Sequence, residues 1–147
     1  MKLNLPEFDV KLSKNGDKVS IFDVIRKKYI LLTPEEWVRQ HFVHYMINQH
    51  QYPKGLIAIE NKLIYGSKLK RTDIQVFTRT GDLFMIVECK APYISIDKSV
   101  LDQAAQYNKI LQAPYIILTN GIDTQSFAID IHQQSVTKLE CLPIYDN

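Results

Sequence analysis

The chain has 147 residues, enough for one domain with a substantial hydrophobic core. Hydrophobic residues make up 46% of it and charged residues 23%, a composition that excludes a disordered chain and is typical of a soluble globular protein. The net charge of +2 is too small to argue for or against a nucleic-acid partner. The first residues lack the apolar core of a secretory signal and no apolar run approaches membrane length, so we expect a cytoplasmic location and no membrane contact.

An N-terminal β-hairpin is predicted over residues 8–22, FDVKLSKNGDKVSIF. Asn15 and Gly16 stand between two runs of alternating apolar residues, and this dipeptide favours a two-residue turn in which both residues take positive φ. Pairing of the two runs about this turn would place four apolar side chains on one face: Val10, Leu12, Val19 and Ile21.

The first helix is predicted from about residue 34 to 50. Thr33 can act as its N-cap, Pro34 fits its first position, and Glu36 can complete a capping box. Its apolar residues recur at helical spacing and form a stripe that is expected to face a core: Trp37, Val38, Phe42, Tyr45 and Met46. The sequence YPKG directly after residue 51 ends the helix.

Three strands, a second helix and a further strand follow along the chain. The strand-like runs are GLIAIENKLIY, TDIQVFT and LFMIVECKA, and a tight turn joins the last two. A helix is predicted over residues 97–112, followed by a short buried strand at 115–119 and a C-terminal hairpin over about 126–142. This order predicts a single α/β domain spanning 1–147, whose core of about 33–121 is built around a mixed sheet flanked by helices.

Three charged side chains come together on the hairpin formed by the second and third of these strands. Glu88 and Lys90 are two residues apart in IVECKAP, so they share one face of their strand. A two-residue loop Thr80–Gly81 would place Asp73 directly opposite Glu88, and a loop one residue later would place it opposite Lys90 and diagonal to Glu88. A three-residue loop would turn Asp73 away from both side chains.

Two carboxylates at this separation repel each other unless a cation lies between them. A divalent metal such as Mg²⁺ would use both carboxylates, a backbone carbonyl and waters as ligands. Such a site suits phosphodiester hydrolysis, in which Lys90 orients the nucleophile or helps to deprotonate it. The alternative is a solvated trio of ion-paired side chains on a strand, which these residues alone favour equally.

The whole arrangement resembles the PD-(D/E)XK nuclease superfamily, whose restriction-endonuclease-like common core has the order αβββαβ. The matching residues are Asp73 in RTDIQVF with Glu88 and Lys90 in VECKAP, and Gln103 and Tyr107 in QAAQY resemble the Gln-x-x-x-Tyr motif of the RecB-like branch. More closely, the run from PEEWVRQ through KRTDI, VECKAP, DQAAQYN and LTNG resembles the N-terminal nuclease domain of type I restriction enzyme R subunits, roughly from residue 20 to 122. The motor domain of those subunits, and with it ATP-driven translocation, is not expected in this chain.

The resemblance implies a metal site and a catalytic lysine. Asp73 and Glu88 would bind Mg²⁺, or alternatively Mn²⁺, together with the backbone carbonyl of Cys89 as a third oxygen ligand. Lys90 would be the catalytic lysine. Glu36 matches an acidic residue of the first helix that some branches use near the metal, although a capping-box carboxylate is the preferred interpretation of this residue.

Contacts with DNA are expected from four residues. Gln103 and Tyr107 are four residues apart and therefore on one face of a helix, and the resemblance implies that they contact the DNA backbone or brace the catalytic lysine. Lys70 and Arg71 lie just before Asp73 and could contact phosphates near the metal. Arg71 is the stronger candidate, because it has the same strand parity as Asp73.

The predicted function is a Mg²⁺-dependent DNA endonuclease acting in restriction, repair or defence. The alternative is a nucleic-acid-binding or protein-interaction module that keeps the fold with little or no catalysis. Asp73, Glu88 and Lys90 favour the enzyme, because a pure binder has no reason to hold repelling carboxylates together. The expected partners are DNA, a specificity or motor protein, and a second copy of the chain, since cutting both strands with one small site favours a dimer.

Overall fold

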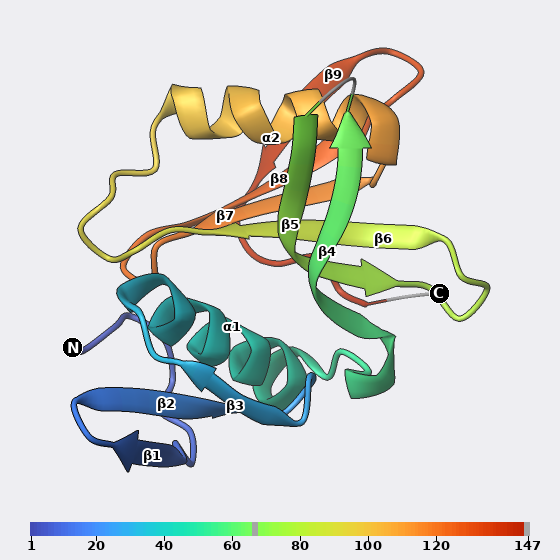
Figure 1. Ribbon diagram of the computed structural model, residues 1–147. Coiled ribbons are helices and arrows are strands. Elements are labelled where there is room, and N and C mark those ends of the chain that lie inside the picture. Colours follow the sequence, from blue (N-terminus) through green and yellow to red (C-terminus); the bar gives the residue numbers. More distant parts are fainter. Residues whose placement is uncertain (66–67, 146–147) are drawn as a thin grey trace.

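The computed structural model describes the backbone of residues 1–65 and 68–145 and the side chains of residues 1–59 and 72–145. Within these residues the chain forms two β-sheets and two α-helices (Figure 1). The N-terminal sheet is antiparallel and contains, in order, β1 (Leu12–Asn15), β2 (Lys18–Asp23) and β3 (Lys28–Leu31). The larger sheet contains, in order, β4 (Ile57–Tyr65), β5 (Lys68–Phe77), β6 (Leu83–Cys89), β7 (Tyr115–Thr119), β8 (Thr124–Asp130) and β9 (Ser135–Leu139).

The two helices lie on opposite faces of the larger sheet (Figure 1). The first, α1 (Pro34–His50), precedes β4, and the short 3-10 helix η1 (Lys54–Leu56) lies between them. The second, α2 (Lys98–Leu111), connects β6 to β7, which are parallel, whereas the other neighbouring strands pair antiparallel. The predicted order αβββαβ, with a mixed sheet between helices and a hairpin at each end, is therefore confirmed.

Alternate residues of β6 pack against different helices. Val87 joins Phe42 of α1 in the larger hydrophobic cluster, and Ile86 joins Val100 of α2 in the smaller one. Both β6 side chains are fully buried. Because side chains alternate along a strand, Glu88 lies on the face of the sheet that α2 covers.

Both helices begin at the predicted capping residues. Thr33 accepts the backbone N–H of Glu36 through its side-chain oxygen at 3.0 Å, and Asp97 accepts the N–H two residues further along at 3.0 Å. The first helix has the predicted bounds of 34–50, and the second is one residue shorter at each end than the predicted 97–112. Local capping chemistry is therefore sufficient to place both helices.

The turn of the N-terminal hairpin differs from the prediction by one residue. Asn15 pairs with Lys18, so the loop residues are Gly16 and Asp17 rather than Asn15 and Gly16. Gly16 takes the positive φ of 64°, which costs glycine little because it has no Cβ, and Asn15 remains in the strand. The shift keeps the faces of the two strands but leaves Val10 outside β1.

The N-terminal sheet also contains a strand that was not predicted. β3 pairs antiparallel with β2, with Ile21 opposite Ile30, and extends the hairpin to three strands beside α1 (Figure 1). Three of the four β3 residues are exposed and two of its neighbours are lysine or arginine, so the alternation that marks a half-buried strand is missing. Among the described residues, none of the helices is both long and apolar enough to cross a membrane.

Candidate active site

Asp73 lies at the point where β5 leaves β6. β5 pairs with β6 from Ile74 to Phe77, whereas its pairing with β4 continues to the start of the strand, and the two strands leave the sheet together as a ribbon (Figure 1). Ile74 is opposite Val87, so the same register sets Asp73 opposite Glu88, the first of the two arrangements considered from the sequence.

The register arises from a longer loop than the sequence suggests. Residues 78–82 form the connection, which is closed by the backbone N–H of Thr78 donating to the carbonyl of Asp82 at 2.7 Å. A β-bulge then shifts the pairing, because Phe77 lies opposite Leu83 while Val76 lies opposite Met85. The bulge compensates for the longer loop and returns Asp73 and Glu88 to facing positions.

Each carboxylate oxygen of Asp73 accepts a hydrogen bond from a neighbouring element. Oδ1 accepts from Nη2 of Arg39 at 2.8 Å, and Oδ2 accepts from the backbone N–H of Cys89 at 2.8 Å. The Asp73 side chain is only 13% exposed. The carboxylate is therefore fixed in orientation between α1 and the end of β6.

Glu88 faces this carboxylate from β6. The pKa of Glu88 is raised to about 8, chiefly by burial and then by the Asp73 carboxylate and a hydrogen bond with it, while the Lys90 ammonium opposes the shift. Oε1 of Glu88 is buried and has no hydrogen-bond partner in the part of the chain that the structure describes. In the absence of a cation, the two carboxylates therefore hold a proton at neutral pH.

Lys90 follows directly after β6 and is half-buried. Its backbone N–H donates to the carbonyl of Thr119 at 2.8 Å, which keeps the residue beside the end of β7. Its ammonium lowers the pKa values of both Glu88 and Glu35, so the charge lies close to the two carboxylates. The structure thus brings together Asp73, Glu88 and Lys90.

The first-helix acid that faces this group is Glu35 rather than Glu36. The pKa of Glu35 is raised by burial and by the Asp73 carboxylate, and is lowered by Arg39 and Lys90. Glu36 is only 3% exposed, and its oxygens accept hydrogen bonds from two arginines and an amide: Arg26, Arg39 and Gln40. The Glu36 carboxylate therefore belongs to a buried ion-pair network, and its position near a metal stays a prediction that this pairing does not favour.

Sequence reasoning missed Glu35 because it sits in the first turn of the helix, where acidic residues are common without any role in a site. A usable signal was the i,i+4 spacing of Glu35 and Arg39, which places them on one face of α1. In the structure Nη2 of Arg39 donates to Oε1 of Glu35 at 2.9 Å and also reaches Asp73.

A chain of buried ion pairs connects the site to the N-terminal sheet. Arg39 pairs with both Asp73 and Glu36, Glu36 pairs with Arg26, and Nε of Arg26 donates to Oδ2 of Asp23 at 2.6 Å. Burial alone would lower the pKa of Arg39, but the Asp73 and Glu36 carboxylates more than reverse this and raise it. Arg39 is therefore a permanent cation that orients Asp73.

Of the remaining predicted residues, two lie on α2 and two have side chains outside the described part of the chain. Gln103 is exposed and Tyr107 is half-buried on α2, the helix that covers the sheet face carrying Glu88. The Lys70 and Arg71 side chains lie outside the described residues, and their backbone belongs to β5 just before Asp73. The thiol of Cys89 is buried, and burial raises its pKa, so the thiol stays protonated in the core. Only the backbone of Cys89 faces the site, where its N–H donates to Asp73.

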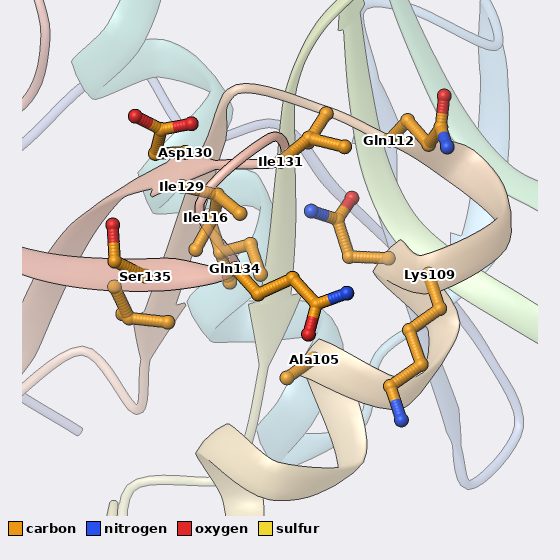
Figure 2. A pocket seen from close by; sticks show the side chains of 11 residues that line it. Ala105, Lys109, Gln112, Ile116, Ile129, Asp130, Ile131, Gln134 and Ser135 are labelled. Carbon is orange, nitrogen blue, oxygen red and sulfur yellow. The ribbon is translucent and has the colours of Figure 1, made fainter.

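A separate cavity of about 540 Å³ lies between α2 and the β8–β9 hairpin (Figure 2). Figure 2 shows Asp130 at its rim and Lys109 on the α2 side, with isoleucines between them. Asp73, Glu88 and Lys90 do not line this cavity, so it is separate from the candidate site. Within the residues described, no group of three or more histidine, cysteine, aspartate or glutamate side chains could hold a metal ion.

The order αβββαβ, with a mixed sheet between two helices, is consistent with a restriction-endonuclease-like fold, and here a pair of facing carboxylates lies where β5 and β6 separate. The chain belongs to the family described as the type I restriction enzyme R protein N terminus, whose model matches residues 34–143. The family model thus covers both helices and the site.

The fold is shared with a solved structure. It is a fragment of a protein assigned as an HsdR subunit of a type I restriction enzyme from Vibrio vulnificus YJ016, with a TM-score of 0.54 and 21% sequence identity. The similarity covers 76% of this chain and 24% of that chain, so this chain spans about a quarter of the length of its structural relative. No curated protein matches the chain.

Proposed function

We propose that the chain is a metal-dependent deoxyribonuclease domain that hydrolyses phosphodiester bonds within DNA, as part of a restriction or related defence or repair system. The observation that carries the proposal is the pair Asp73 and Glu88, held face to face beside Lys90 at the end of β6. Membership in the type I restriction enzyme R family supports DNA as the substrate and a specificity or motor protein as a partner.

A divalent cation fits the donors that the site offers. Glu88 Oε1 is buried and has no hydrogen-bond partner among the described residues, and the raised pKa of Glu88 means that a proton offsets the repulsion between the carboxylates. Asp73, Glu88 and the carbonyl of Cys89 would hold Mg²⁺ or Mn²⁺, since hard cations prefer oxygen ligands. Such an ion, when bound, supplies an acidified water and charge stabilisation at the phosphate.

The side chains around the carboxylates would divide the remaining tasks. Lys90 would orient the attacking water and favour its deprotonation by stabilising the hydroxide, because the Lys90 ammonium lies close enough to Glu88 and Glu35 to lower the pKa of both carboxyls. Arg39 would position Asp73 without touching the substrate, since it is 3% exposed and its guanidinium is paired with three carboxylates. Glu35 is 46% exposed at the mouth of the site and would adjust the local charge.

A second candidate is a DNA-binding module without catalysis. The observation that favours it is that both oxygens of Asp73 already accept hydrogen bonds, one from Arg39 and one from Cys89. A metal would have to share these oxygens with donors that are in place. This module would bind DNA in a salt-dependent way, with or without Mg²⁺.

A cleavage assay tests the proposal. Plasmid, single-stranded and branched DNA are incubated with Mg²⁺ or Mn²⁺ and with wild type, Lys90→Ala or Glu88→Gln. A matched control is Lys18→Ala, a lysine exposed on β2. We expect cleavage by wild type and the control, and a loss of at least about a hundredfold in both site variants, the scale of a lost acid–base group. Equal cleavage by all four proteins, or DNA binding without cleavage by any, would contradict the proposal.

A further inference from the structure

An open cleft of about 690 Å³ leads directly out of the candidate site. One wall is formed by the end of β3 and the first turns of α1, and the other by the connection from β6 to α2, which Figure 1 shows close to α1. Glu35, Arg39 and Lys90 line it together with several apolar side chains. A ligand in the part of this cleft lined by Glu35, Arg39 and Lys90 therefore lies beside residues of the candidate site.

Three large apolar side chains in the cleft are exposed to water. Tyr93 is 72% exposed, Leu31 is 54% exposed and Ile94 is 41% exposed. Neighbouring apolar groups that stay in water in this way mark surfaces that bind a ligand. Tyr93 is the most exposed of the three, and its ring offers a flat aromatic face.

The backbone that carries Tyr93 is anchored on both sides. The N–H of Ile94 donates to the carbonyl of Ala91 at 3.0 Å, and Nδ2 of Asn120 donates to the carbonyl of Ile94 at 2.7 Å. Lys90 is held in turn by its hydrogen bond to Thr119. Because the turn is fixed before any ligand binds, ordering it adds little cost to binding.

We propose that this cleft binds an unpaired nucleobase, which stacks on Tyr93 while the adjoining phosphate lies at Lys90. The inference rests on the proposed function and names its substrate class: DNA with a single-stranded or displaced nucleotide beside the cut. In a duplex both faces of each base are covered by its neighbours, so only a base that has left the stack can reach the ring. A protein partner seated here would cover Lys90 and close the site.

A binding assay tests the inference without requiring cleavage. The affinities of a fluorescein-labelled single-stranded oligodeoxynucleotide and of the duplex of the same sequence are measured by anisotropy in EDTA. The variants are Tyr93→Ala, Tyr93→Phe and Tyr93→Leu. The control is Tyr29→Ala, because Tyr29 is 49% exposed on β3 and is not among the described residues that line the cleft.

Loss of one base–aromatic stack is expected to weaken single-strand binding by about tenfold or more in the Ala and Leu variants. The Phe variant and the control should stay within about twofold of wild type, and duplex binding should be equal in all proteins. The inference is overturned if the Ala variant binds the single strand like wild type, or if wild type binds no single strand. It is also overturned if Leu replaces Tyr93 without loss, which indicates an apolar docking surface for a protein.

The inference and the proposed function fail separately. If Tyr93→Ala loses single-strand affinity while wild type never cuts DNA, the stacking site stands and the nuclease proposal fails. If wild type cuts DNA and Tyr93→Ala cuts single strands with an unchanged KM, the nuclease proposal stands and the stacking site fails.

Discussion

Arg39 Nη2 and Asp73 Oδ1 lie 2.8 Å apart and join the first helix to the strand that carries the candidate site. Both groups are largely withdrawn from water, with 3% and 13% of their side chains exposed. Glu36 holds the other terminal nitrogen of Arg39, so the guanidinium cannot turn away. The position of one proposed metal ligand is therefore set by a buried cation on a different element.

Removal of this cation is expected to destabilise the fold strongly. Arg39→Met removes the cation that the buried Asp73 and Glu36 carboxylates share, and breaking a buried pair in this way costs about 3–5 kcal/mol. Urea denaturation measures the free energy of unfolding. The control Arg79→Met replaces an exposed arginine in the β5–β6 connection and should change it by less than about 0.5 kcal/mol. Similar losses in both variants would refute the role given to Arg39.

The two neighbouring glutamates of α1 should behave differently. Glu36→Gln replaces the carboxylate that pairs with Arg26 and Arg39 by a neutral amide. It should lower the free energy of unfolding by about 3 kcal/mol. Glu35→Gln should cost less than about 1 kcal/mol, because Glu35 is 46% exposed. Its effect should instead fall on DNA cleavage, as it faces Asp73 and Lys90. A larger loss of stability from Glu35→Gln would reverse this assignment.

Glu88 should make the metal-free protein less stable as the pH rises. Its pKa is raised to about 8 in the folded state, from 4.5, so between these values the folded chain binds more protons than the unfolded chain. The stabilisation from this proton is complete below pH 4.5 and is lost as the pH rises through 8. Urea titrations in EDTA at pH 5 and pH 8 compare wild type with Glu88→Gln.

The difference between these two proteins isolates the contribution of Glu88, because other titrating groups contribute equally to both. One such group is Asp23: burial opposes a lowering of its pKa, but hydrogen bonds from Arg26 lower it nevertheless. From pH 5 to pH 8, wild type should lose more than about 1 kcal/mol relative to Glu88→Gln. Parallel pH dependences would mean that Glu88 is not protonated in the folded state.

The N-terminal turn offers a test of the corrected register. Gly16 has a φ of 64°, so Gly16→Ala should lower the free energy of unfolding by about 1 kcal/mol. Asn15→Ala, in the preceding exposed strand position, should stay within about 0.5 kcal/mol of wild type. Thermal unfolding of the two variants distinguishes this turn from one centred on Asn15, in which Asn15→Ala would be the costlier change.

The parts of the fold that depend on neighbouring residues were predictable from the sequence. Thr33 specifies the start of α1 by capping it, and Pro34 does so by its fixed φ. Asp97 caps the start of α2. Strand parity placed Asp73 and Glu88 on one face, but the two-residue loop considered for their register is replaced by a longer connection and a β-bulge that restore the same facing. These features need no knowledge of which elements pack together.

The parts that depend on distant residues were not predictable in this way. The position of Glu36 in the first turn of α1 suggests a capping residue. Its carboxylate instead accepts a hydrogen bond from Arg26, which lies in the turn after β2. The bulge beside Phe77 and the pairing of β3 with β2 also depend on partners elsewhere in the chain. Sequence spacing cannot rank such contacts, since they become adjacent only after folding.

We expect Asp73 and Glu88 to exchange a shared proton for a divalent cation when such an ion binds. Calorimetric titration of Mn²⁺ at pH 7, repeated in buffers of different ionisation enthalpy, measures both the affinity and the protons released. Glu88, with a pKa of about 8, is mostly protonated at this pH, so wild type should release nearly one proton per ion bound. Glu88→Gln should bind at least about tenfold more weakly and release none. Binding by wild type without proton release, or with an affinity that Asp73→Asn and Glu88→Gln leave unchanged, would contradict the account.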